Sequence, residues 1–381
     1  MNHGNVLVIS PQPWDHIPVS KHNYAVALAR RGHRVVFLNP PEDDLAATST
    51  CGDVPEHPGL RVLSYRRPWF YNLRFHAPAV FDWLMIRHVT KLLRSHQCVP
   101  DLVWSFDCNL FPDLSVFGAS QQIFHPVDPL SESRHVMPAR TANLVLTVSR
   151  RIAGQIAPVG RPVHVVQHGL ALPFERLAHD QLVRLKTRDD KCKQGAAEKT
   201  VQVGYAGNLA RRPVNRAVLK QIVAENSRVQ FHFWGPDKCD SDPAADFIAL
   251  LRQQTNVTLH GAVSQIQLAE AYREMDAFLL SYLPDPVESD RSNSHKILEY
   301  LSSGKVIVSS HLQAYEEHSD LLVMSQTEDD SDLAQLFSGT IDRLQMLNSS
   351  QRQEQRIAFA LENTYDRHIV NIFQLLNAGG T

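Results

Sequence analysis

Short apolar runs alternate with amphipathic stretches along most of the chain. The N-terminal part opens with the apolar run Val6–Ile9, continues with apolar positions at helical spacing that stop at Gly32, and reaches a second apolar run at Val35–Leu38. Short apolar runs are typical of strands buried on both faces of a parallel sheet, and apolar positions three or four residues apart are typical of a helix with one buried face. The order strand, helix, strand predicts a right-handed crossover unit.

This alternation continues to about residue 166, breaks at the charged and poorly apolar stretch Lys186–Lys199, and starts again at Val201. Repeated alternation of strands and helices predicts an α/β fold with doubly wound parallel sheets. We therefore expect two Rossmann-like domains facing a central cleft at the carboxyl ends of both sheets. The expected divisions are a first domain at 1–170, a linker at 171–199, a second domain at 200–350 and a helical C-terminus at 351–381 that is a candidate for crossing back to the first domain.

Composition and charge exclude several classes of protein. The 381 residues include 38 Lys and Arg against 40 Asp and Glu, a net charge of −2, which excludes a globally basic nucleic-acid binder. No apolar run is long enough to span a bilayer, and the start of the chain lacks the basic and apolar regions of a signal peptide, so we expect a cytoplasmic protein. The five cysteines form no Cys-x-x-Cys pair and the histidines form no close-spaced ligand set, so neither a disulfide framework nor a metal site is expected.

The most informative stretch, residues 292–308, has the pattern of a polar loop, a helix, a glycine stop and a buried strand. The loop residues Ser292–Ser294 suit a helix cap, and the N–H groups at such a helix start bind anions. Lys296 lies in the first turn, and Glu299 follows one turn later on the same face. A cation for a diphosphate and a carboxylate for a ribose diol would hold a nucleotide, and an ordinary surface Lys–Glu pair is the equal alternative.

The stretch 292–308 resembles the donor-binding segment of the GT-B glycosyltransferases, which carry a Lys-x-x-Glu helix followed by a glycine and an apolar strand. Tyr205–Leu209 looks like the glycine turn beneath the donor diphosphate, and Phe233–Pro236 and His260–Gly261 lie where that fold has its next two strand-end loops. The resemblance implies that the first domain binds an acceptor and that the second binds a nucleotide-diphosphate sugar. The sugar nucleotide, with a UDP-sugar as the expected donor, is a substrate, and no cofactor is expected.

The resemblance also implies which residues hold the donor. They are Gly207, Asn208, Arg211, Arg212, Trp234, Gly235, Tyr282, Ser294, His295, Lys296 and Glu299. Because no metal ion is expected at this site, side-chain cations and backbone dipoles would stabilise the leaving diphosphate. For the two arginines, a solvated turn is the alternative.

The sequence pattern that would indicate the stereochemistry of the sugar transfer is less complete. Retaining relatives commonly carry a Glu eight positions before the second Glu; here that position is Arg291, with Asp290 one step away. In contrast, the segment His125–Ser131 resembles the Asp-x-Leu-Ser segment of bacterial glucuronosyltransferases that assemble xanthan-type polysaccharides, whose aspartate is the base. This resemblance implies an inverting transfer in surface-polysaccharide assembly with Asp128 as general base. The second candidate base is His125, and a structural role for Asp128 in the turn before Pro129 is the alternative.

Acceptor binding is expected in the loops of the first domain. Asp15 and His16 directly follow the first strand, where functional loops of such sheets lie. They are candidate contacts to an acceptor hydroxyl, and a cap for the helix that starts near Ser20 is the alternative. The expected acceptor is a glycan or a lipid-linked saccharide.

Residues 61–96 combine positive charge with aromatic side chains. The segment contains seven Lys or Arg, one acid (Asp82) and seven aromatic residues. This mixture suits an anionic membrane surface, and we expect peripheral contact with the inner face of the cell membrane and no nucleic-acid partner. Single-stranded nucleic acid, or an aromatic core helix flanked by solvated arginines, are the alternatives. The acidic residues Glu328–Asp330 and Asp332 are expected in a solvated loop and helix start.

Two other classes remain open from the sequence. One is a nucleotide-sugar epimerase or phosphorylase of the same fold, and a retaining transferase is a closely related alternative. The other is a non-catalytic partner that keeps the fold and binds a glycan or nucleic acid.

Overall fold

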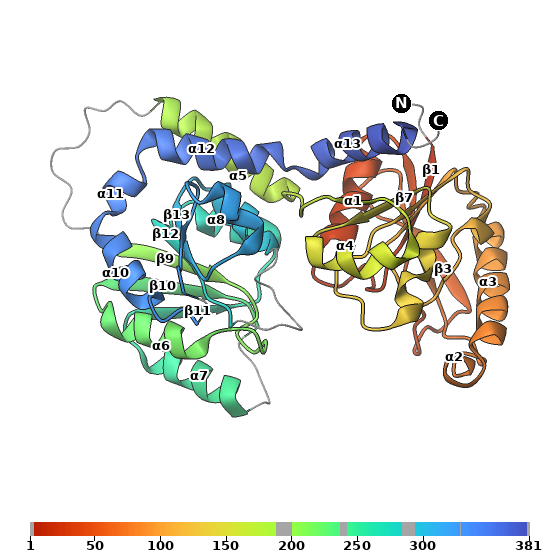
Figure 1. Ribbon diagram of the computed structural model, residues 1–381, viewed down its shortest axis with the longest axis horizontal. Coiled ribbons are helices and arrows are strands. Elements are labelled where there is room, and N and C mark those ends of the chain that lie inside the picture. Colours follow the sequence, from red (N-terminus) through yellow and green to blue (C-terminus); the bar gives the residue numbers. More distant parts are fainter. Residues whose placement is uncertain (1–3, 188–199, 237–241, 284–293, 328, 379–381) are drawn as a thin grey trace. The chain divides into compact units, whose positions relative to one another are not determined.

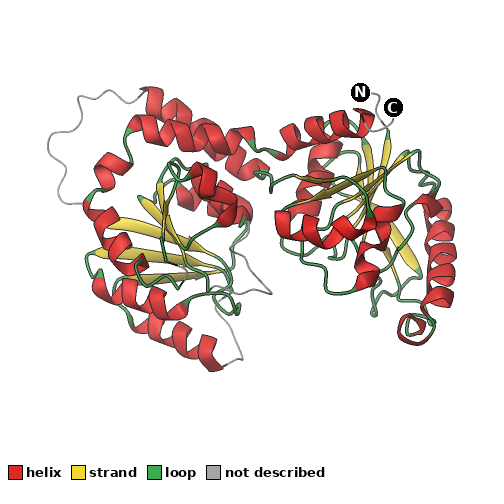
Figure 2. Cartoon of the chain, in the orientation of Figure 1, coloured by secondary structure: helices red, strands yellow, loops and turns green. Residues whose placement is uncertain are grey.

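The chain forms two compact units in the computed structural model, which describes residues 4–187, 200–236, 242–283, 294–327 and 329–378 (Figure 1). The first unit comprises Met1–Gln167 together with Tyr365–Thr381, and the second comprises His168–Thr364. The chain therefore returns to the first unit at its C-terminus. Each unit is an α/β layer structure with helices on both faces of a sheet (Figure 2).

The first unit contains an eight-stranded sheet in the order β3-β4-β2-β1-β5-β6-β7-β8. Neighbouring strands are parallel except for the edge strand β3, which is antiparallel to β4. The strands are β1 (Asn5–Ile9), β2 (Arg34–Leu38), β3 (Ser49–Asp53), β4 (Leu60–Tyr65), β5 (Leu102–Ser105), β6 (Gln121–Phe124), β7 (Leu144–Thr147) and β8 (Val163–Val165). The helices are α1 (Ser20–Arg30), α2 (Leu73–His76), α3 (Pro78–Ser95), α4 (Arg150–Ile156) and α13 (Tyr365–Ala378).

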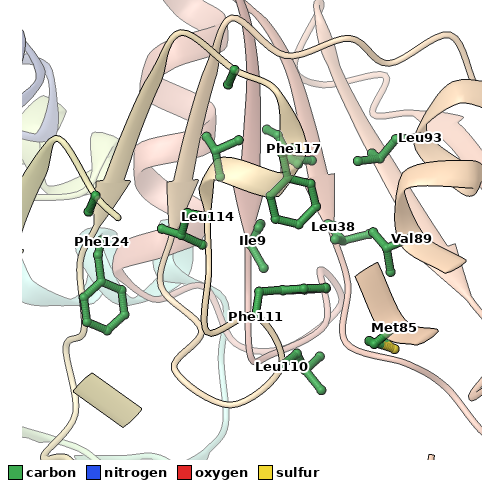
Figure 3. Close-up of a cluster of buried hydrophobic side chains, with 14 of the residues drawn as sticks. Ile9, Leu38, Met85, Val89, Leu93, Leu110, Phe111, Leu114, Phe117 and Phe124 are labelled. Carbon is green, nitrogen blue, oxygen red and sulfur yellow. The ribbon is translucent and has the colours of Figure 1, made fainter. Parts of the chain in front are cut away.

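Alternate side chains of these strands face two separate cores. On one face, Leu38 and its neighbours pack against Met85 and Val89 of α3 and against Phe111, as Figure 3 shows. On the other face, the Tyr24 ring of α1 lies 4.8 Å from the Trp104 ring, measured between centroids. This alternation is the period-two pattern of a strand covered on both sides. It accounts for the unbroken apolar runs in the sequence.

The second unit contains a six-stranded parallel sheet in the order β11-β10-β9-β12-β13-β14. Its strands are β9 (Val201–Ala206), β10 (Val229–Trp234), β11 (Val257–Gly261), β12 (Ala277–Leu280), β13 (Val306–Ser309) and β14 (Val323–Met324). Its helices are α5 (Leu172–Thr187), α6 (Arg216–Glu225), α7 (Asp242–Gln253), α8 (Gln265–Tyr272), α9 (His295–Leu301), α10 (Leu333–Asp342), α11 (Leu344–Leu347) and α12 (Ser350–Glu362). Figures 1 and 2 show α6, α7 and α10 on one face of the sheet and α5, α8 and α12 on the other. This strand order is that of the doubly wound dinucleotide-binding sheets.

The stretch 171–199, expected as a linker, begins with a packed helix. Phe174, Leu177 and Ala178 of α5 are buried, and α5 lies beside α8 and α12. The charged residues at the end of α5 masked this apolar face in the sequence. Residues 188–199 lie outside the described part of the chain. Of the helices in the described segments, none is both long and apolar enough to cross a bilayer.

A buried arginine fixes the end of the helix that carries Lys296. Arg356 of α12 donates hydrogen bonds to the carbonyl oxygens of Gly304 (3.0 Å), Leu347 (2.9 Å) and Leu321 (3.0 Å). Gly304 follows α9 with a φ of 77°, a conformation in which glycine is favoured. Burial lowers the pKa of Arg356 to about 10, so the guanidinium stays charged at neutral pH.

Replacing Arg356 by methionine should therefore destabilise the second unit. The change leaves three buried carbonyl oxygens without their donor, which should reduce the free energy of unfolding by about 3 kcal/mol or more. Denaturant unfolding followed by circular dichroism measures the change. Arg352→Met, on the exposed face of the same helix, is the matched control and should change stability by less than about 0.5 kcal/mol. Equal unfolding midpoints for the two variants would contradict the anchoring role.

Candidate functional site

The strand order of the second unit creates a topological switch point. The connection from β9 leads to β10 on one side, whereas β12 pairs with β9 on the other. Ligands of open α/β sheets bind at the carboxyl ends of the strands that flank such a point. Gly207 follows β9 and Tyr282 lies two residues after β12, so the fold brings both of these expected donor-binding residues to this place.

Lys296 reaches the same point from α9. Its Nζ donates a hydrogen bond to the Tyr282 hydroxyl at 2.5 Å and lies 5.1 Å from the centroid of that ring. A Cβ added to Gly207 would lie 2.6 Å from the Lys296 Nζ. The ammonium group therefore lies against the glycine turn, and any larger residue at position 207 would displace it. Three segments far apart in the sequence thus meet at one cation.

The glycine turn itself depends on close backbone contact. Gly207 donates its N–H to the Trp234 carbonyl oxygen, and Gly235 donates its N–H to the Gly261 carbonyl oxygen, both at 2.8 Å. A Cβ at Gly235, where φ is 140°, would lie 2.1 Å from the Gly207 carbonyl oxygen. The expected donor residue Gly235 is therefore required by the packing of the turn, whether or not it also touches a ligand.

The polar residues of the turn divide into structural and exposed ones. The Asn208 side-chain oxygen accepts the N–H of Ala210 at 2.9 Å, which closes the turn locally. Arg211 and Arg212 are exposed. Arg211 lies close enough to His295 for its charge to lower the pKa of that ring. The structure thus places Arg211 near the start of α9, whereas Arg212 is exposed in the same turn.

Trp234 does not present its ring to a ligand. The side chain is buried, and the exposed His260 ring covers it in a parallel stack with 4.8 Å between centroids. His260 also forms a hydrogen bond of 2.9 Å with His232. The expected donor contact through the Trp234 side chain is therefore corrected: Trp234 is a core residue, and His260 provides the exposed aromatic surface at this strand end.

The start of α9 is close to the pattern expected from the sequence. Ser294 is the N-cap residue, although its hydroxyl forms no cap hydrogen bond. His295 keeps exposed surface, but desolvation by the surrounding protein, followed by the charges of His168, Lys296 and Arg211, lowers its pKa to about 3. Its ring lies 5.8 Å from that of His168 in an edge-to-face arrangement. His295 is therefore neutral at physiological pH and leaves Lys296 as the cation of this helix start.

Glu299 lies one turn after Lys296 and is half-buried. Burial raises the pKa of its carboxyl group to about 8, and the Lys296 ammonium partly opposes this effect. Among the described residues, no ion pair joins Lys296 to Glu299, because Lys296 bonds to Tyr282 instead. The alternative of an ordinary surface Lys–Glu pair is therefore not what the structure shows. The Glu299 carboxyl group remains available for a ligand.

Two residues that the sequence analysis did not single out hold Tyr282 in place. The Ser310 hydroxyl accepts the Tyr282 N–H at 2.8 Å and donates to the Asp330 carboxylate at 2.6 Å. Asp330 is buried and has a φ of 59°, which is uncommon for a residue other than glycine. The expectation that this acidic run is solvated is thus wrong for Asp330. The sequence signal for this contact is weak, because a serine directly after a strand, such as Ser310, is common.

The expected base Asp128 lies in the first unit, in the loop that follows β6, and is exposed. The Lys21 side chain is buried at the start of α1, and burial lowers its pKa while the charges of Asp128 and Asp107 oppose that effect. Within the described residues the Asp128 carboxylate accepts no hydrogen bond from the turn before Pro129. Its alternative role as a turn cap is therefore unsupported, and solvent access leaves it able to meet an acceptor.

His125, the second candidate base, is fully buried. Its ring stacks on Phe106 with 5.1 Å between centroids, and its Nδ1 accepts the Trp104 indole N–H at 3.4 Å. A side chain enclosed by aromatic rings cannot approach an acceptor hydroxyl without rearrangement of this core. The structure therefore favours a packing role for His125 and argues against its use as a base.

The candidate acceptor residues Asp15 and His16 are exposed in the loop after β1. His16 Nδ1 lies 2.8 Å from the Ile17 carbonyl oxygen. The first turn of α1 is closed by the His22 ring, which accepts the Val19 N–H at 3.2 Å. Asp15 and His16 are thus not the cap of α1, and their role toward an acceptor stays a prediction.

Several expected residues lie outside the described part of the chain. These are Ser292 and Asn293 before α9, and the positions of the retaining pattern around Asp290. In the segments that are described, no group of three or more His, Cys, Asp or Glu side chains is placed to hold a metal ion.

Comparison with known proteins agrees with the geometry of the second unit. The family described as "Glycosyl transferases group 1" matches residues 201–342, all of them in that unit. No curated protein matches the chain by sequence.

Solved structures match over nearly the whole chain. A glycosyltransferase from Rickettsia africae has a TM-score of 0.67 at 11% identity, covering 100% of this chain and 99% of the other. Anabaena HepE in complex with UDP and glucose has a TM-score of 0.64 at 15% identity, covering 98% and 100%. The sucrose-phosphate synthase of Thermosynechococcus elongatus has a TM-score of 0.65 at 12% identity, covering 98% and 99%.

The expected two-domain GT-B fold is confirmed by these matches and by the two parallel sheets, while the finer resemblance to xanthan-type glucuronosyltransferases stays a prediction. The chain is therefore a glycosyltransferase with the GT-B fold, and residues 201–342 of its second unit match the family described as glycosyl transferases group 1.

Proposed function

We propose that this glycosyltransferase moves a sugar from a UDP-sugar to a hydroxyl group of a glycan or lipid-linked saccharide in bacterial surface-polysaccharide assembly. The observation that carries the donor assignment is the position of the Lys296 ammonium, which lies against Gly207 at the switch point of the second sheet. A UDP-sugar is favoured because HepE, with the same fold, is described in complexes with UDP and with UDP-glucose. The polysaccharide role rests on the resemblance of the Asp128 segment.

Each of the proposed residues would bind a different part of the donor. Lys296, with Arg211 near the start of the same helix, would bind the diphosphate. The Glu299 carboxyl group would accept hydrogen bonds from the ribose diol, and the exposed His260 ring would offer a surface for the base. A diphosphate held by fixed side-chain cations leaves without reorganisation of solvent, which is the main catalytic contribution expected of such a site.

The proposed reaction inverts the anomeric centre and needs no metal ion. The acceptor oxygen attacks the anomeric carbon as the bond to the diphosphate oxygen breaks. The hydroxyl proton moves to the Asp128 carboxylate, and the bonding electron pair leaves with the diphosphate, beside Lys296. Mass spectrometry and NMR of products formed from a panel of UDP-sugars and a short-chain lipid-linked saccharide test both the transfer and its stereochemistry.

Lys296→Ala should weaken the binding of UDP. Loss of the ammonium removes a charge-assisted contact to phosphate, and the dissociation constant should rise about tenfold to a hundredfold. Isothermal titration calorimetry measures the change. Lys220→Ala, which removes an exposed lysine from α6 of the same unit, is the control. Unchanged affinity in the Lys296 variant would refute the diphosphate assignment.

Binding of a UDP-sugar should strengthen with increasing pH up to about 8, the pKa of Glu299. Below that pH the carboxyl group is protonated, and it must lose its proton before it can accept both ribose hydroxyls. The association constant should therefore rise about tenfold per pH unit between pH 6 and 7.5.

A control variant separates the titration of Glu299 from that of other groups. His295 titrates near pH 3, and the diphosphate diester of a UDP-sugar does not titrate in the range. In Glu299→Gln the profile should be flat. A flat profile in the unmodified protein would show that Glu299 does not bind the ribose in its ionised form.

Asp128→Asn should abolish transfer and leave donor binding intact. The amide keeps the shape of the carboxylate but cannot take the acceptor proton, so the rate should fall by at least about a hundredfold, with the donor dissociation constant unchanged. Glu132→Gln, an exposed carboxylate four residues later, is the matched control and should retain activity. Full activity of Asp128→Asn would remove it from the mechanism.

A further inference from the structure

Helix α3 of the first unit has two distinct faces. Its inward face packs on the sheet through Phe81, Met85 and Val89, and Figure 3 shows the last two within the core cluster. Its outward face, at helical spacing, begins with Val80 and Trp83 and ends with basic residues. Packing of the core does not require the solvent-facing side of α3 to begin with apolar residues and to end with basic ones.

The exposed aromatic side chains of the described chain gather here. Trp69 is 89% exposed, Phe75 66% and Trp83 56%, and Val80 beside them is 50% exposed. Every other Phe, Trp or Tyr in the described residues is buried or half-buried. Exposed aromatic residues that are concentrated in one short segment of a globular protein indicate an interaction site. We name these four side chains, with the basic residues below, the α2–α3 surface.

Positive charge surrounds these aromatic residues. Within the described segments, four exposed cations on this surface have no carboxylate within ion-pair distance; they are Arg74, Arg87, Lys91 and Arg94. The single acid of the segment, Asp82, forms a salt bridge with Arg134. Arg67 is paired with Asp43 at 2.9 Å. The α2–α3 surface therefore has a net positive charge that the protein itself does not neutralise.

The cations lie on the aromatic rings. The Arg74 guanidinium is 4.4 Å from the Phe75 ring centroid, and the Arg87 guanidinium is 4.8 Å from that of Trp83. Phe75 and Trp83 thus each have a guanidinium over one face. These two rings are therefore less suited to the stacking of nucleic-acid bases, which needs open ring faces. A second copy of the same surface would add like charges and is disfavoured for that reason.

We propose that the α2–α3 surface docks on an anionic lipid bilayer. Tryptophan and phenylalanine side chains lie at the level of the headgroups, and unpaired arginines and lysines contact the lipid phosphates. The docking deepens the proposed function, because a lipid-linked acceptor would be held in the same membrane. Its test uses neither donor nor acceptor, so failure of docking and failure of the donor assignment are separate results.

The test is binding of the full chain to vesicles of phosphatidylcholine alone or mixed with phosphatidylglycerol. Co-sedimentation should show at least about tenfold tighter binding to the mixed vesicles, and the binding should weaken with added salt as counterions screen the surface. Tryptophan emission should shift to shorter wavelength on binding. Equal binding to both vesicle types, or none to either, would overturn the proposal.

Two variants test the aromatic residues and the basic residues of the surface separately. W69S/W83S should lose the emission shift and at least about tenfold in affinity, and R74Q/R87Q/K91Q should lose the preference for phosphatidylglycerol. The controls change an exposed apolar residue and an exposed lysine of the second unit, Ile266→Ser and Lys220→Gln, and should bind vesicles normally. All variants should keep the circular-dichroism spectrum and the unfolding midpoint of the unmodified protein. Vesicle binding that survives both surface variants, or equally tight binding of single-stranded DNA that these variants abolish, would contradict lipid docking.

Discussion

The candidate site of the second unit depends on the position of the Lys296 ammonium group. Lys296 lies in the first turn of α9, where a cation opposes the helix dipole, and it is held by the Tyr282 hydroxyl and by contact with Gly207. Within the described part of the chain no carboxylate forms an ion pair with it. A cation held rigidly in an unfavourable place, at the switch point of a parallel sheet, is most stable when an anion is bound. The proposed donor site rests on this constraint.

The contacts around Lys296 show why the supporting residues are needed. Moving Tyr282 would release the ammonium, and Tyr282 is fixed through its backbone by Ser310, which is fixed by Asp330. The other end of α9 is fixed separately by Arg356. A strained backbone at Asp330 is maintained only where the surroundings determine it strongly. These contacts thus hold the Lys296 ammonium group in place before any ligand binds.

The sequence predicted the fold well because its signals are local. Four-residue apolar runs located most strands of both sheets, and glycine at 207, 235 and 304 marked turns that tolerate no larger residue. Features set by long-range packing were not predictable. The helix α5 has a charged end that resembles a linker, and the edge strand β3 is short and polar.

The candidate site was also predictable only in part. Lys296, Tyr282 and Gly207 were predicted from the family resemblance, and the structure brings them together. Trp234 and His125 were chosen for their residue type beside a strand end, but both are buried in aromatic packing. Asp330 was missed because its burial depends on Ser310, a partner twenty residues away. Residue type and spacing indicate which chemistry is available, but burial decides which side chains can use it.

The raised pKa of Glu299 would respond both to the diphosphate and to the ribose of a bound nucleotide. A diphosphate on Lys296 would cancel the charge that now favours the ionised carboxylate, whereas ribose hydroxyls would donate directly to that carboxylate. The first effect would raise the pKa of Glu299, and the second would lower it. Side chains one turn apart on a helix have Cβ atoms about 5–6 Å from each other, while a hydrogen bond joins atoms about 2.8 Å apart. Since electrostatic interactions fall with distance, the proposed direct bonds to the ribose should dominate, and we expect proton release to accompany nucleotide binding.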